Sequence, residues 1–128
     1  PVAFITCNSS PPTKKSPAFF THYDVETLFH EFGHGLQHML TTINYAGISG
    51  ISGVEWDAVE LPSQFMENWC WEKNVLDTFA FDYKTKKKLP SALFKKLLAR
   101  EILILENTPT EWMKIWSCML IYRKQIQF

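Results

Sequence analysis

The stretch that decides the fold is DVETLFHEFGHGLQHMLTT, residues 24–42. Its apolar residues recur at spacings of three and four, the repeat of one face of an α-helix. They are Val25, Leu28, Phe29, Phe32, Leu36, Met39 and Leu40. Asp24 is a residue type favoured at a helix N-cap, and β-branched residues follow Leu40. We therefore expect one helix that begins after Asp24 and ends near Thr41 or Thr42.

The same stretch contains the motif H-E-x-x-H, written His30-Glu31-Phe32-Gly33-His34. Residues four apart lie about 40° apart around a helix, so both imidazoles can reach one metal ion. Glu31 lies further round the helix and is placed to accept a proton from a water molecule. The apolar face is on the other side, so we expect it to pack against the core while the motif faces a cleft.

A zinc hydrolase needs three protein ligands and one open position. His38 is about 12 Å along the helix from His30, too far to share the ion. Gln37 and Leu40 stand where the longer metzincin motif requires glycine and histidine, which excludes that subclass. A carboxylate from the following segment remains, and the candidates are Glu55, Glu60 and Glu67.

The segments after the motif decide between these candidates. Residues 47–53, GISGISG, hold three glycines and predict a loop. A second helix is expected over 58–79 with Pro62 in its first turn, and a third over 91–106. Glu60 lies at the start of the second helix, beyond a loop long enough to fold it back, so we assign it as the third ligand. Glu67, seven residues on, shares its face and is expected to orient a ligating histidine.

Composition narrows the class of protein. The chain has 128 residues, 46% of them hydrophobic, with 13 basic and 13 acidic side chains. The high apolar fraction and the zero net charge argue against a disordered chain. A chain without an excess of basic residues also lacks the positive surface of a nucleic-acid or membrane-surface binder. No apolar run approaches the roughly 18–20 residues of a membrane span. The three cysteines are far apart, which predicts no disulfide framework and favours a reduced, cytoplasmic setting.

The quoted motif, the glycine loop and the stretch WDAVELPSQFMENW (56–69) together resemble the oligopeptidase A branch of the thimet oligopeptidase family. Residues 2–7, VAFITC, are rich in β-branched and aromatic residues and predict a short N-terminal strand. The resemblance implies a mainly α, zincin-like fragment that contains this strand, the zinc helix, the loop and two further helices. It implies a zinc metalloendopeptidase that cuts short peptides, with one Zn²⁺ per chain. His30, His34 and Glu60 match the family's metal ligands. Glu31 matches the general base, which takes a proton from the zinc-activated water.

The resemblance runs from Pro1 to about Arg100. We therefore expect residues 1–106 to be a fragment of a metallopeptidase catalytic domain and 107–128 a divergent tail, left by truncation or a frameshift. Short peptides are the expected partners of a monomer, with no nucleic acid and no membrane, and substrate-binding residues cannot be assigned. The alternative is a non-catalytic remnant that keeps a zinc site and associates through exposed apolar surface. A purely structural zinc site is disfavoured, because such sites usually have four ligands, often cysteines.

Overall fold

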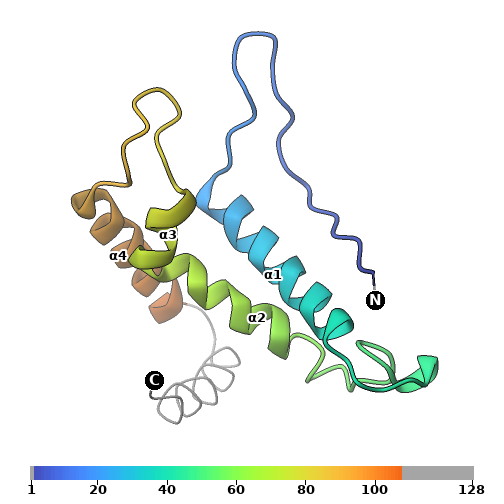
Figure 1. Ribbon diagram of the computed structural model, residues 1–128. Helices are drawn as coiled ribbons and strands as arrows, with labels where there is room; N and C mark the ends of the chain where they lie inside the picture. The colour runs from blue at the N-terminus through green and yellow to red at the C-terminus, as the bar shows by residue number, and fades with distance from the viewer. Residues whose placement is uncertain (1, 108–128) are drawn as a thin grey trace. The chain divides into compact units, whose positions relative to one another are not determined.

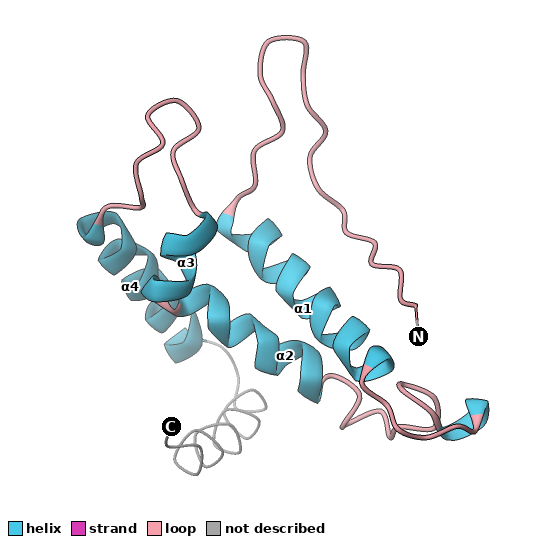
Figure 2. Ribbon diagram, in the orientation of Figure 1, coloured by secondary structure: helices cyan, strands magenta, loops and turns pink. Residues whose placement is uncertain are grey.

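The structure is a computed structural model that describes the backbone of residues 2–107 and the side chains of residues 2–100. The described chain is helical, as expected (Figures 1 and 2). Its elements are α1 (His22–Met39), η1 (Ala46–Ile48), α2 (Leu61–Glu67), η2 (Asn68–Trp71), α3 (Lys73–Phe79) and α4 (Ser91–Asn107). They belong to two compact units, of which the first ends at Phe79 and the second begins at Ala80. The predicted tail, 107–128, lies outside the described residues apart from Asn107 itself.

Helix α1 begins with a capping box. Thr21 is the N-cap: its Oγ1 accepts a bond from the Asp24 amide at 3.2 Å, and its own amide donates to Asp24 Oδ2 at 2.7 Å. Hydrogen bonds from the Thr21 side chain and backbone lower the pKa of Asp24. The sequence-based N-cap assignment was therefore wrong by three residues, because Asp24 is the reciprocal partner at the third helical position. The helix ends at Met39, slightly earlier than predicted.

The predicted second helix is divided. Helix α2 begins at Leu61 with Pro62 in its first turn, as expected, but the chain tightens into η2 and is extended at Glu72 before α3 begins. The two core residues Cys70 and Leu76, 0% and 3% exposed, lie on either side of this break. On a continuous helix these two side chains would point about 120° apart. Because the helix is interrupted at Glu72, both can be buried. Burial raises the pKa of the Cys70 thiol to about 12.

The expected N-terminal strand is absent from the described residues, which carry one isolated β-bridge, between Phe81 and Lys88. A strand exists only where a neighbouring strand shares its backbone hydrogen bonds. The described chain supplies no such neighbour for residues 2–7, so this expectation was wrong here. The segment instead runs back to α1, where Ala3 and Ile5 lie beside Gly35 (Figure 1).

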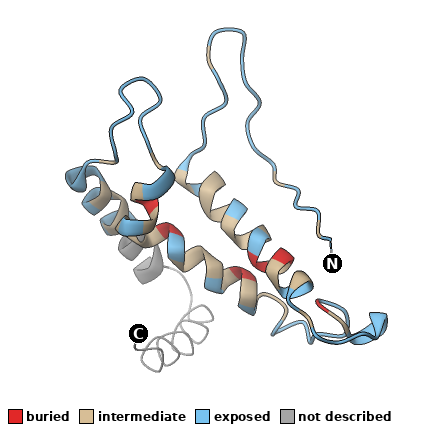
Figure 3. Cartoon of the chain, in the orientation of Figure 1, coloured by how far each residue is buried: buried red, intermediate tan, exposed pale blue. Residues whose placement is uncertain are grey.

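Helix α2 packs beside α1 on the side that carries the motif (Figures 1 and 3). A Cβ atom built on Gly33 would lie 2.5 Å from both the Pro62 carbonyl oxygen and the Ser63 Cα. Only glycine therefore allows the start of α2 to come this close. On the apolar face Leu28 and Phe32 are 41% and 40% exposed, so the expectation that this face forms the main core was wrong. The absent side chain of Gly33, more than hydrophobic periodicity, decides where α2 packs.

The remaining described segments are loops and α4. The predicted glycine loop is confirmed: Gly50 and Gly53 adopt positive φ angles of 63° and 75°, and η1 forms within it. In the second unit a turn over 82–87 precedes α4, which matches the helix predicted from Ser91. No helix in residues 2–107 combines the length and apolar character needed to span a membrane.

Candidate metal centre

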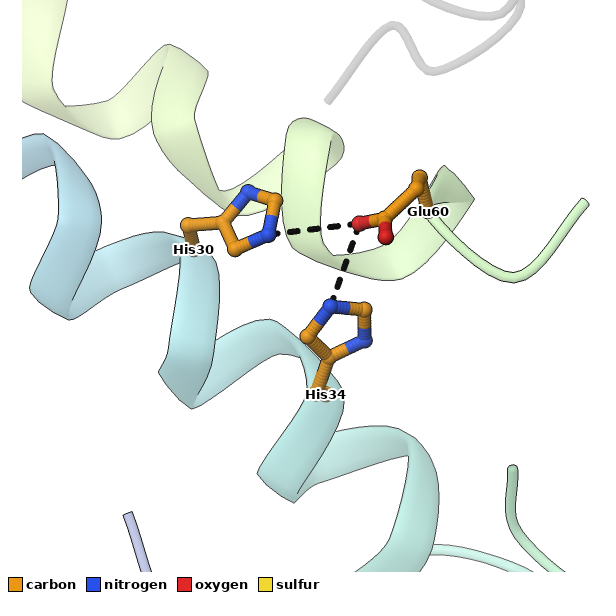
Figure 4. A group of neighbouring side chains, drawn as sticks. All are labelled: His30, His34 and Glu60. Atoms are coloured by element: carbon orange, nitrogen blue, oxygen red, sulfur yellow. Dashed lines mark ion pairs between the residues drawn. The ribbon is translucent and has the colours of Figure 1, made fainter. Parts of the chain in front are cut away.

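Three of the predicted site residues come together at the start of α2 (Figure 4). His30 and His34 project from consecutive turns of α1, and Glu60 is the N-cap residue of α2. Glu60 Oε2 lies 3.2 Å from His30 Nε2 and 3.1 Å from His34 Nε2. One carboxylate oxygen therefore faces the corresponding nitrogen of both imidazoles.

These distances suit a shared metal ion. Two donors that each lie 2.0–2.1 Å from a tetrahedral zinc ion are about 3.3–3.4 Å apart. The two measured nitrogen–oxygen distances, 3.2 and 3.1 Å, are close to this edge length, and all three donors lie within 4.8 Å of one another. Two imidazoles and a carboxylate are also the donor types found in catalytic zinc sites. The residues present thus fit the metal that the sequence predicts.

The other ring nitrogen of His30 has its own carboxylate partner. His30 Nδ1 lies 2.5 Å from Glu67 Oε1, at the far end of α2. A carboxylate oxygen accepts hydrogen bonds, so in this contact the Nδ1–H group of His30 is the donor. The lone pair of Nε2 is then directed toward His34 and Glu60. An orienting role for Glu67, as predicted, requires a contact of this kind, because a carboxylate bound to one ring nitrogen directs the other toward a metal.

The three donor side chains are partly exposed. The side chains of His30 and His34 are 26% and 20% exposed, and that of Glu60 is 43% exposed. His34 Nδ1 is buried and has no hydrogen-bond partner among the described residues. A partly exposed donor set leaves space for a further small ligand, which a catalytic site requires and a closed structural site does not.

Glu31 is next to His30 on α1 and is half-buried. It lies outside the set of three donors, and its side chain makes no hydrogen bond or ion pair within the described part of the chain. Its carboxylate oxygens are therefore not occupied by another protein group in residues 2–100, and both can accept a proton.

The structure also separates the rejected candidates from the centre. Glu55 is exposed in the turn before α2, and its backbone carbonyl accepts bonds from the amides of Ala58 and Val59. His38 is exposed one turn beyond His34 and lies against Gly50 of the glycine loop. Neither is part of the cluster. The two cysteines with described side chains, Cys7 and Cys70, are also outside it, and Cys118 lies beyond the described residues.

Sequence reasoning missed one residue of the site. Ser63 is completely buried, and its hydroxyl oxygen lies 2.8 Å from both the carbonyl oxygen and Oε2 of Glu60. The signal was a hydroxyl residue three positions after Glu60, directly following Pro62. This spacing places it one helical turn from Glu60 once Glu60 is known to be the N-cap.

Two histidines one helical turn apart, with a glutamate between them and a carboxylate from a second helix, are typical of metal-dependent hydrolases. The comparison with known sequences agrees with this class. The chain belongs to peptidase family M3, whose sequence model matches residues 1–109.

The curated relatives include enzymes named for peptide cleavage. Oligopeptidase A of Escherichia coli (strain K12) is 63% identical over 99 residues, which are 77% of this chain and 15% of that protein. The organellar oligopeptidase A of Arabidopsis thaliana is 54% identical over 99 residues, 77% of this chain and 12% of that protein. Saccharolysin of Saccharomyces cerevisiae (strain ATCC 204508 / S288c) is 39% identical over 98 residues, which are 77% of this chain and 14% of that protein. The matched part of the present chain thus spans 12–15% of the length of these relatives.

The contact at Gly33 gives the first testable prediction. Gly33→Ala places a Cβ 2.5 Å from backbone atoms of Pro62 and Ser63, which must move. We expect the free energy of unfolding to fall by about 1–3 kcal/mol, as for other overpacked sites. We also expect zinc binding to weaken, because Glu60 moves together with α2. Thermal unfolding and a zinc titration measure the two effects.

Gly35→Ala is the matched control. Gly35 is also buried in α1, but it faces away from α2, and its new Cβ would meet only the Ile5 and Ala3 side chains, at 3.6 Å or more. Alanine favours the helix over glycine by up to about 1 kcal/mol, so this variant should be unchanged or slightly more stable. Equal behaviour of the two variants would contradict the close contact between α1 and α2.

Proposed function

We propose that this chain carries the zinc-binding catalytic region of a metalloendopeptidase that hydrolyses short peptides. His30, His34 and Glu60 hold one zinc ion, and Glu31 is the general base. The proposal is supported above all by the single oxygen of Glu60 that lies 3.2 and 3.1 Å from the Nε2 atoms of both histidines, in a chain of peptidase family M3.

A bound zinc ion supplies a Lewis acid that polarises a peptide carbonyl and makes a water molecule more acidic. Glu31 accepts a proton from the attacking water and returns it to the leaving amine. His30, the residue before Glu31, is held in place by its contact with Glu67. Because His30 and Glu31 are consecutive residues of α1, the helix also fixes how far the base lies from the metal ligands. Partial exposure of His34 and Glu60 leaves room for the peptide to approach.

The substrate class follows from the relatives. Those named oligopeptidases are named for short peptides, and we extend this preference to the present chain. No nucleic-acid or membrane partner is proposed, since the formal net charge is zero. We propose a monomer in a reduced, cytoplasmic compartment. One relative from Arabidopsis thaliana is named "cytosolic" and another "chloroplastic/mitochondrial", so the names of relatives do not decide the compartment. The proposal of a reduced, cytoplasmic compartment is therefore based on the widely spaced cysteines of this sequence.

Cleavage of a short quenched-fluorescence peptide by the full chain tests the function. We expect hydrolysis with added zinc, its loss in the presence of a chelator, and its recovery when zinc is restored. Hydrolysis that persists at the same rate in chelator would contradict the proposal.

A non-catalytic zinc-binding segment is the second candidate. It is favoured by the exposed Leu28 and Phe32 on α1. One zinc per chain without any peptide cleavage would select it. In that case we expect the chain to associate as its concentration rises, because the apolar face of α1 is exposed, and light scattering measures this association.

A further inference from the structure

The glutamate of the metal centre is held in an unusual way for a residue at its position. Glu60 is the N-cap of α2, where a side-chain oxygen normally accepts a bond from the amide at the second or third helical position. Its carboxylate makes no such bond. The second position is Pro62, which has no amide hydrogen to donate. One of the two natural partners that would turn the carboxylate back toward the helix is therefore missing.

The hydroxyl of Ser63, at the third position, approaches the carboxylate instead. Ser63 Oγ lies 2.8 Å from Glu60 Oε2 and 2.8 Å from the Glu60 carbonyl oxygen. Both oxygens are acceptors, so the single hydroxyl proton is donated to one or shared between them. Oε2 is the same oxygen that faces His30 and His34. Ser63 thus contacts the one Glu60 atom on which the proposed metal site depends.

Ser63 is 0% exposed, whereas the side chain of Glu60 is 43% exposed. A buried hydroxyl in a rigid helix turn is a fixed donor, while a partly exposed glutamate is free to rotate toward solvent unless it is held. Holding a long carboxylate in one rotamer removes in advance part of the entropy that metal binding must otherwise overcome. Gly33 makes this arrangement possible, because its absent side chain leaves the space that the Ser63 backbone occupies.

We propose that Ser63 is a positioning residue for Glu60: its hydroxyl directs the carboxylate toward α1, and Pro62 removes a competing amide. The inference rests on the proposed function, since it gives Ser63 a role only if Glu60 binds the metal. Among the described residues the Ser63 hydroxyl makes no hydrogen bond to His30 or His34, so it acts through Glu60.

Zinc and cobalt(II) titrations of the full chain and of Ser63→Ala test this role. Loss of a residue that orients a metal ligand typically weakens metal binding about 10–100-fold, and we expect a decrease in that range. The visible absorption of the cobalt(II) form should also change in the saturated S63A complex, because the spectrum depends on how the carboxylate coordinates. A residue that only stabilised the helix would not alter that spectrum.

Thr78→Ala is the matched control. Thr78 Oγ1 donates to the carbonyl of Val75, three residues back in α3, at 2.6 Å. This is the same hydroxyl-to-carbonyl bond that Ser63 can make to Glu60, but the Thr78 hydroxyl makes no hydrogen bond to a carboxylate among the described residues. We expect T78A to bind zinc with the affinity of the unaltered chain and to give the same cobalt spectrum.

A second variant covers the case in which S63A does not fold. Pro62→Ala restores an amide at the second helical position, which can then attract the Glu60 carboxylate. We expect zinc binding to weaken by about fivefold, the equivalent of one N-cap bond. Unchanged affinity in P62A would overturn the inference.

The outcomes separate the two proposals. If the unaltered chain binds zinc and S63A binds it equally well with the same cobalt spectrum, the role of Ser63 is wrong and the proposed function stands. If S63A binds more weakly but its saturated spectrum is unchanged, Ser63 has a structural role only and the inference is again overturned. If the folded, unaltered chain binds no zinc, the proposed function fails and the role of Ser63 fails with it.

Discussion

Glu31→Gln is expected to abolish peptide cleavage while leaving zinc affinity unchanged. Glutamine has nearly the shape of glutamate but cannot accept the proton of the attacking water. General bases typically contribute about 10²- to 10⁴-fold to the rate, so cleavage should fall by at least the lower figure. Zinc binding should persist because Glu31 lies outside the donor set of His30, His34 and Glu60. Initial rates on a short peptide and a parallel zinc titration measure both quantities.

Glu55→Gln is the control for this variant. It makes the same chemical change at an exposed glutamate that the structure places outside the cluster. Its cleavage rate should match that of the unaltered chain. Undiminished cleavage by E31Q would remove Glu31 from the mechanism. Loss of zinc from E31Q would instead mean that Glu31 contributes to the metal site.

The second large effect is expected at the third ligand. Glu60→Ala removes the carboxylate oxygen that lies 3.2 and 3.1 Å from the two Nε2 atoms. Changing a group that merely supports a ligand costs about 10–100-fold in affinity, so removing a ligand itself should cost more than about 100-fold. Competition with a zinc chelator of known affinity measures the change.

Glu55→Ala is the matched control, because it removes a carboxylate five residues earlier in the same connection. It should bind zinc like the unaltered chain. If E60A binds zinc normally, Glu60 is not a ligand. If E55A loses zinc while E60A does not, the sequence-based choice between these two glutamates was the wrong one.

Local pattern was sufficient for part of the fold. Helix α1 was predicted because its apolar residues repeat at three and four, and Pro62 correctly marked the first turn of α2. The break at Glu72 was not predicted, since no glycine or proline occurs there. It depends on the burial of Cys70 and Leu76, which is a tertiary effect. The N-terminal strand was wrongly predicted because β-propensity does not show whether a partner strand is present.

The candidate site was predictable where spacing alone determines geometry. His30 and His34 are one turn apart on any helix, so their approach could be expected. Glu60 required the chain to fold back, and Glu67 required α2 to lie alongside α1. Both contacts are present in the structure. The packing side of α1 was predicted wrongly because hydrophobic periodicity gave no weight to Gly33, whose missing side chain admits α2. Ser63 was missed for a related reason: its role appears only once Glu60 is known to be an N-cap.

The most direct test of the account is the zinc content of the purified, folded 128-residue chain, measured by elemental analysis beside His30→Ala. We predict about one zinc per unaltered chain and a clear loss in H30A, with the helical circular dichroism of both proteins recorded as a check on folding. One zinc would show that the donors on α1 and α2 assemble within this chain. A folded, unaltered chain that takes up no zinc, or an H30A variant that retains it fully, would contradict the account.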